Sequence, residues 1–97
     1  MTSFQAEKES IRKEKTRQAI ALAMQSRWKE AEAVNRAILK SFPDEVEAYN
    51  RLGKALMELG RYAPAREAFE RALALAPYNA IAKKNLSRLA LLRHETP

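Results

Sequence analysis

The sequence predicts an all-α protein in which antiparallel helix-turn-helix units stack on one another. One observation is an internal repeat: the segment SRWKEAEAVNRAI begins at Ser26, and the similar segment GRYAPAREAFERA begins 34 positions later, at Gly60. The other is composition, because the 97 residues include only two glycines and are rich in Ala, Leu, Glu, Lys and Arg, which favour helix over strand. A single helix pair of this length cannot bury its own apolar face, so neighbouring units must supply the core.

The first expected helix is long and begins with a polar half. A hydroxyl at Thr2 is followed three residues later by Gln5, which fits a capping box, and nothing from there to Ala23 breaks a helix. Dense apolar spacing starts only at Ala19. Residues 1–18 are therefore expected to form a polar helical extension that projects into solvent or frays.

The second and third expected helices meet at a proline turn. Apolar residues three or four positions apart begin at Trp28 and end before Pro43, where the preceding residue disfavours the helical conformation. The same spacing resumes at Val46 and continues to Leu59. So short a connection predicts two antiparallel neighbours.

The fourth and fifth expected helices complete the chain. Gly60 can adopt the left-handed conformation that is common after helix ends. Pro64 then falls in the first turn of the fourth helix, where its missing N–H costs nothing, and this helix closes before Pro77. A fifth helix is expected over residues 80–93, which leaves residues 94–97 as a tail.

Residues 46–79 carry a more specific pattern of small, aromatic and aliphatic side chains. The sites are Tyr49, Leu52, Gly53, Leu56, Gly60, Tyr62, Ala65, Phe69, Ala72 and Pro77. Their types and order resemble the tetratricopeptide repeat, a family of helix-turn-helix units that serve mainly as protein-interaction scaffolds. Residues 12–45 resemble the family chiefly in their second half, and Asn35 stands where the family has an aromatic residue.

The resemblance implies one domain, residues 1–97, folded as a short right-handed α-solenoid of five helices. It would contain about two units, a divergent one over residues 12–45 and a well-matched one over residues 46–79. Residues 80–93 would form a C-terminal cap helix.

The side chains that catalysis requires are scarce. Cysteine is absent, and the single histidine, His94, lies close to the end of the chain. The single aspartate, Asp44, follows Pro43 and is better explained as a turn residue or helix cap. No Gly-rich phosphate loop is present. We therefore expect no enzymatic activity, no cofactor and no metal site.

The N-terminal segment MTSFQAEKESIRKEK lacks the apolar core of a signal peptide. No later apolar run approaches the ~18 residues that a membrane span needs. The absence of cysteine gives no sign of an oxidising compartment. These features predict a cytoplasmic protein without a membrane partner.

The resemblance also implies that the first helix of each unit lines a concave groove. Basic and amide side chains fall at several of the groove positions: Arg17, Asn50, Arg51, Lys54, Lys84, Asn85 and Arg88. The other groove positions include Ile20, Ala23, Glu47 and Ile81. The asparagines could hydrogen-bond an extended peptide or hold a carboxylate, and the cations would attract an acidic peptide. The alternative is that these charges only solubilise an exposed helical face.

Two other functions stay open at this point. The net charge of +6 allows an accessory role in nucleic-acid binding, although the charge is dispersed along the chain, which makes this role less favoured. Ile81, Leu91 and Leu92 add apolar side chains to another face of the fifth helix, where a solvating cap should be polar. They could support a weak homodimer through a two-fold contact, or form a small patch that a monomer tolerates.

The register of the repeat can be tested at the expected helix crossing. Ala65→Leu should overpack the helix pair and lower the free energy of unfolding by ~1–3 kcal/mol. Ala63→Leu, at the turn, is the matched control and should have a far smaller effect. Urea unfolding followed by circular dichroism measures both, and equal losses would mean that the register is wrong.

Overall fold

The computed structural model describes residues 3–95, which form five α-helices and no strand. The helices are α1 (Ser3–Met24), α2 (Trp28–Ser41), α3 (Val46–Glu58), α4 (Tyr62–Leu75) and α5 (Ala80–Glu95). The all-α prediction is confirmed, and the fifth helix extends two residues beyond its expected end. Thr2 of the expected capping box and residues 96–97 of the expected tail lie outside the described residues.

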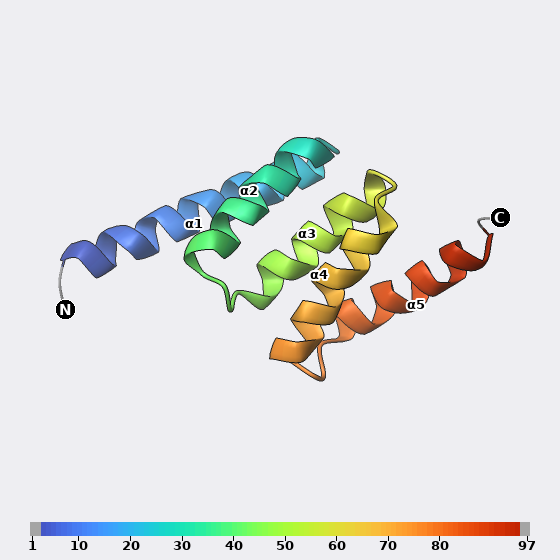
Figure 1. The fold of residues 1–97 in the computed structure, drawn as a ribbon. Coiled ribbons are helices and arrows are strands. Elements are labelled where there is room, and N and C mark those ends of the chain that lie inside the picture. The colour runs from blue at the N-terminus through green and yellow to red at the C-terminus, as the bar shows by residue number, and fades with distance from the viewer. Residues whose placement is uncertain (1–2, 96–97) are drawn as a thin grey trace.

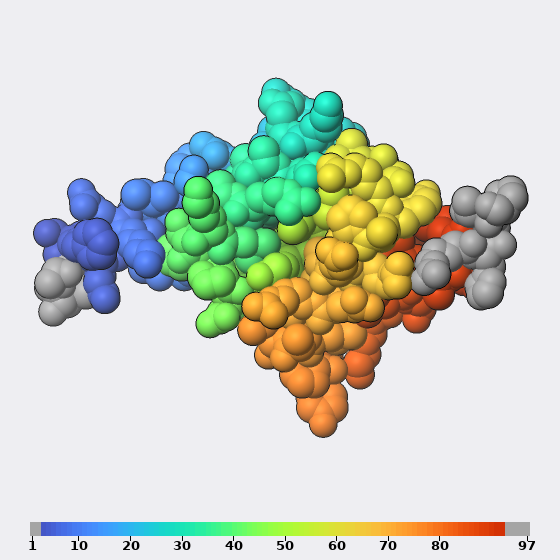
Figure 2. Space-filling view, viewed as in Figure 1, coloured from blue at the N-terminus to red at the C-terminus, as the bar shows by residue number. Residues whose placement is uncertain are grey.

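The helices form two antiparallel pairs and a final single helix (Figure 1). α1 packs on α2, α3 packs on both α2 and α4, and α5 packs on α4. The molecule measures 54 × 29 × 18 Å, and it is elongated from the start of α1 toward the end of α5 (Figure 1). Residues 3–11 are all exposed, and in the space-filling view this blue part of α1 extends past the rest of the molecule (Figure 2). The polar half of α1 therefore lies in solvent as a helix.

The two pairs turn in the same way, through a residue in the left-handed conformation. Ser26 has φ 58° and Gly60 has φ 78°. In each turn the next residue donates its N–H back across the helix end: the Arg27 nitrogen lies 2.9 Å from the Leu22 carbonyl oxygen, and the Arg61 nitrogen lies 2.9 Å from that of Leu56. These bonds satisfy carbonyl groups that a helix end leaves without a partner.

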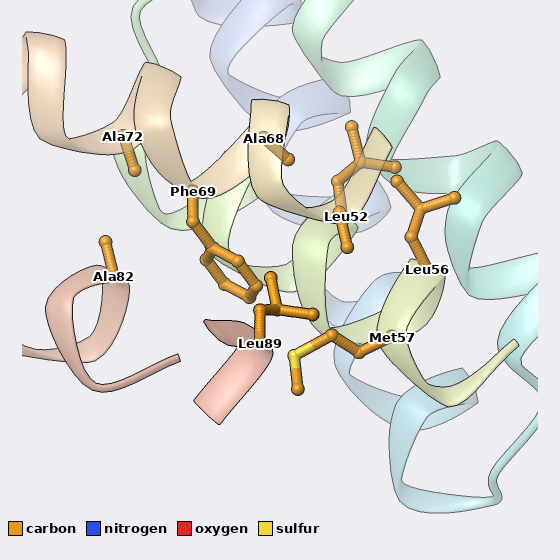
Figure 3. Close-up of a cluster of buried hydrophobic side chains, with 9 residues drawn as sticks. Leu52, Leu56, Met57, Ala68, Phe69, Ala72, Ala82 and Leu89 are labelled. Carbon is orange, nitrogen blue, oxygen red and sulfur yellow. The ribbon is translucent and has the colours of Figure 1, made fainter. Parts of the chain in front are cut away.

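The closest packing lies in the second pair, where Phe69 of α4 meets the backbone of α3. A Cβ atom added to Gly53 would lie 2.6 Å from Cζ of Phe69, so only glycine permits this approach. Phe69 directs its ring toward Leu52 of α3 and Leu89 of α5, which places it at the centre of the core cluster (Figure 3). Ala65 is fully buried in the same cluster.

The first pair uses different side chains at the equivalent positions. Ala19 of α1 stands where the second pair has Gly53, and Asn35 of α2 stands where it has Phe69. Both are buried, and a separate apolar cluster forms around Ala19 and Ile38. A phenylalanine at position 35 would meet the Ala19 Cβ atom if it packed as Phe69 does, so the smaller asparagine is compatible with alanine.

A half-buried carboxylate joins the two pairs. Glu32 of α2 accepts a 2.9 Å hydrogen bond from Nε of Arg36 and a 3.0 Å bond from Nη1 of Arg61, which precedes α4. Burial alone raises the pKa of Glu32, but the two guanidinium groups outweigh burial and hold this pKa below its ordinary value. The carboxylate is therefore charged whenever the protein is near neutral pH.

This ion pair predicts a pH dependence of stability. Because the folded pKa of Glu32 is depressed, its stabilisation is present above the unfolded value of about 4.3 and is lost as the pH falls through the folded pKa. Glu32→Gln should be less stable than wild type at neutral pH, and the difference should shrink in acid. Thermal melts across this range measure it. Glu30→Gln, which removes an exposed carboxylate paired with Arg27, is the control, and an equal pH effect there would contradict the prediction.

Candidate binding groove

The first helices of the pairs and the final helix surround a pocket of about 400 Å³. α1, α3 and α5 border it, whereas α2 and α4 cover the face turned toward the viewer in Figure 2. The lining residues are Ile20, Ala23, Glu47, Asn50, Arg51, Lys54, Ile81 and Asn85. The volume lies within the range of small-ligand pockets, so it suits a few side chains of an extended segment.

Aliphatic side chains from two helices give the pocket apolar walls. Ile20 of α1 is 45% exposed and Ile81 of α5 is 56% exposed, with Ala23 beside Ile20 on the same helix. Covering such side chains removes apolar surface from water, which stabilises a complex. The pocket can therefore hold an aliphatic group of a ligand.

Arg51 is the most unusual polar residue of the pocket. Its Nε donates a 2.9 Å hydrogen bond to Oδ1 of Asn35, while its Nη2 is buried and has no hydrogen-bond partner. Burial of the guanidinium lowers the pKa of Arg51, and the charges of Glu45 and Glu47 partly offset this. Arginine nonetheless stays protonated in proteins. The pocket thus contains a half-buried positive charge that no carboxylate of the described chain hydrogen-bonds.

Asn50 also lines this pocket, but its acceptor oxygen is buried. Its Nδ2 donates a 3.0 Å bond to Oδ1 of Asn79, and that oxygen also accepts the backbone N–H of Ala82 in the first turn of α5. Because Asn79 must offer its oxygen to α5, Asn50 must offer its nitrogen to Asn79. This leaves Oδ1 of Asn50 without a partner, on a side chain that is only 7% exposed.

The side-chain amide of Asn85 also donates to an acceptor within the protein. Its Nδ2 donates a 3.0 Å bond to the carbonyl oxygen of Ile81 in its own helix, which fixes the nitrogen on the helix side. Each Nδ2 uses only one of its two N–H groups in this way, and Oδ1 of Asn50 is buried, so Asn85 is the groove asparagine that is more open to a ligand. Contact with an extended backbone and contact with a carboxylate both stay predictions.

Lys54 is the second cation at the pocket. Its Nζ lies 2.7 Å from Oε2 of Glu58 and 5.9 Å from the centre of the Trp28 ring. Both partners are on the protein, so the charge of Lys54 is already largely balanced. Arg51 is consequently the stronger attractor for a ligand carboxylate.

The other basic residues predicted for the groove do not line this pocket. Arg17 borders a separate hollow with Arg12, Lys13, Thr16 and Glu45, and pairs with Glu14 at 3.0 Å. Lys84 and Arg88 are exposed on α5. The structure thus brings together Asn50, Arg51, Lys54 and Asn85, and leaves the remaining three cations around them.

The residues predicted for self-association are also separated. Ile81 belongs to the groove, Leu91 is exposed, and Leu92 packs half-buried against the main core cluster. Ile81 and Leu91 lie about 15 Å apart along α5 at 1.5 Å per residue. Leu92 is thus partly covered by the core, whereas Ile81 and Leu91 are exposed, and self-association through α5 stays a prediction.

Asn35 was not placed at the groove by the sequence analysis. It lies on α2, outside the helices that border the pocket, yet it holds a pocket side chain by a direct hydrogen bond. The available signal was its place in the repeat, where an aromatic residue is expected.

Comparison with known proteins supports a repeat scaffold. A family model described as a tetratricopeptide repeat matches residues 16–93, which is most of the chain. No curated protein matches the sequence. Every helix in the described chain is too short or too polar to cross a membrane. Among residues 3–95, no three His, Cys, Asp or Glu side chains cluster as metal ligands would.

Proposed function

The chain belongs to the tetratricopeptide repeat family, whose members are generally protein-interaction scaffolds, and from this premise we propose that its groove binds an extended acidic segment of a partner protein. The segment would place an aliphatic side chain between Ile20 and Ile81 and the carboxylate of a neighbouring Asp or Glu at Arg51. A backbone N–H group of the segment would donate to Oδ1 of Asn85.

The observation that carries this proposal is the half-buried guanidinium of Arg51, which lines the pocket and is hydrogen-bonded by no carboxylate of the described chain. Its Nη2 is buried without a partner, and a buried polar group without a hydrogen bond costs about 1–3 kcal/mol, and more when it is charged. An acidic peptide offers a carboxylate that would balance this charge at the accessible part of the side chain.

The surrounding charges favour an internal acidic segment over a single terminal carboxylate. Arg17, Lys84 and Arg88 are exposed on α1 and α5, on both sides of the pocket. Such dispersed cations attract several carboxylates along an extended chain. Glu47 on the pocket rim would repel a carboxylate placed beside it, which limits where the acidic side chain can lie.

Nucleic-acid binding is the less favoured candidate. The pocket has aliphatic walls and contains no aromatic side chain on which a base could stack. Arg17 and Lys54 are paired with glutamates of the same helices, so fewer cations are free to neutralise phosphates. The positive net charge remains its only support.

Fluorescence polarisation with short capped peptides tests the proposal. The probes are a labelled peptide with repeated Leu–Glu pairs and an otherwise identical peptide with Leu–Gln pairs, both acetylated and amidated. Wild type should bind the Glu peptide about tenfold more tightly, because a charge-assisted hydrogen bond contributes about 1.5–3 kcal/mol before desolvation of the peptide carboxylate. A labelled DNA duplex of the same charge is the third probe.

Two variants distinguish the effect of the pocket residue Arg51 from the effect of the overall positive charge. Arg51→Gln should lose most of the preference for Glu over Gln, while Arg71→Gln, which removes an exposed charge of α4 outside the groove, should keep it. Circular dichroism confirms that both fold. Equal affinity of wild type for the two peptides would reject the proposal, and tighter binding of the duplex would replace it with the nucleic-acid function.

A further inference from the structure

We propose that Asn35 is a positioning residue that sets the guanidinium of Arg51 for a ligand carboxylate, so that a departure from the repeat pattern on α2 creates the specificity of the groove. This inference rests on the proposed function. According to this inference, Asn35 is buried and touches no partner, but it determines whether the groove prefers acidic over neutral segments.

The amide of Asn35 is fixed by its own helix. Nδ2 donates a 2.9 Å hydrogen bond to the carbonyl oxygen of Ala31, one turn earlier in α2. A flipped amide would set two oxygens against each other, so Oδ1 must face away from Ala31. The side chain is 1% exposed, and water cannot substitute for either bond. Asn35 thus presents a rigid acceptor toward α3.

Arg51 of α3 meets this acceptor with Nε, at 2.9 Å. An arginine side chain loses much rotamer freedom when it is held, and a bond at Nε fixes the plane of the guanidinium. The bond is made before any ligand arrives, so the ligand does not bear that ordering cost. Nη2 is buried without a partner, and no carboxylate of the described chain hydrogen-bonds the guanidinium, so its charge is left for a ligand that enters the pocket.

The neutrality of Asn35 matters as much as its position. An amide oxygen orients the guanidinium without cancelling its charge, whereas a carboxylate at this position would form an internal ion pair. The carboxylates of Glu45 and Glu47 act on Arg51 only through their charge and accept no hydrogen bond from it. The positive charge therefore remains available to a ligand.

Packing of the helix pair alone would not require an asparagine at position 35. The second pair fills the equivalent space with Phe69 against Gly53, where an added Cβ atom would lie 2.6 Å from the ring. The same aromatic packing in the first pair would need two changes, Ala19→Gly and Asn35→Phe. The chain has instead an alanine and a buried amide, and the amide bonds to a groove residue.

The double variant Ala19→Gly with Asn35→Phe is the main test. It recreates the packing of Gly53 and Phe69, so the protein should stay folded by circular dichroism while Arg51 loses its acceptor. The preference for the Leu–Glu peptide over the Leu–Gln peptide should fall from about tenfold to less than about twofold. Ala19→Gly alone is the matched control. It should lower stability, because glycine disfavours helix, and keep the preference.

Asn35→Asp is a second variant that keeps the shape of the side chain. Its carboxylate should pair with Arg51 and abolish the preference for the Glu peptide at neutral pH. Because its second oxygen would face the Ala31 carbonyl in place of Nδ2, this variant should be less stable, and circular dichroism checks that it is folded before binding is compared. A purely structural role for Asn35 would not change which peptide is preferred. If both variants fold and keep the tenfold preference, the positioning role is wrong.

A measurement without peptide separates this inference from the proposed function. In wild type, exchange of the Arg51 Nε–H with solvent, followed by nuclear magnetic resonance, should be slow, and it should accelerate at least about tenfold in the double variant. Slow exchange in wild type together with equal binding of the two peptides would reject the proposed function, and the specificity role with it. Unchanged exchange in the double variant would reject the positioning contact alone.

Discussion

The close approach of α3 and α4 at Gly53 and Phe69 is the constraint on which the rest of the structure depends. An aromatic ring can lie against the α3 backbone only because position 53 has no Cβ atom. The ring then reaches Leu89, so one contact joins α3, α4 and α5 into a single core. That core holds α5 beside α3, which is the condition for a pocket that both helices line.

The first helix pair has the same arrangement as the second but carries different side chains where the two helices cross. These side chains include a polar one that bonds to the groove. Asn35 occupies the place of the aromatic ring and directs its oxygen to Arg51. Asn50, the preceding residue on α3, is tied to the start of α5 through Asn79. The groove residues of α3 are thus held from both sides, and their unpaired atoms are fixed in place by bonds that the fold itself requires.

The sequence predicted the helices well because helix ends and apolar spacing are local. Gly60 was expected in the left-handed conformation and adopts it, whereas the same conformation at Ser26 was not foreseen, since serine carries no such preference. The contacts of the groove residues were harder to predict from the sequence. Arg51 was predicted to be a cation of the groove, with a solubilising surface charge as the alternative, and only the stacking of α2 against α3 reveals that it is half-buried. The partial burial of Leu92 was missed for the same reason, because it depends on neighbours distant in sequence.

The central claim is that Arg51 receives a carboxylate of a partner segment between the aliphatic walls of the pocket. Titration with the capped Leu–Glu peptide, followed through the side-chain Nε–H resonance of Arg51, tests it most directly. The account predicts that this resonance shifts together with the methyl signals of Ile20 and Ile81, and that all these shifts give one dissociation constant. Shifts confined to the face of α2 and α4, with Arg51 unchanged, would contradict it.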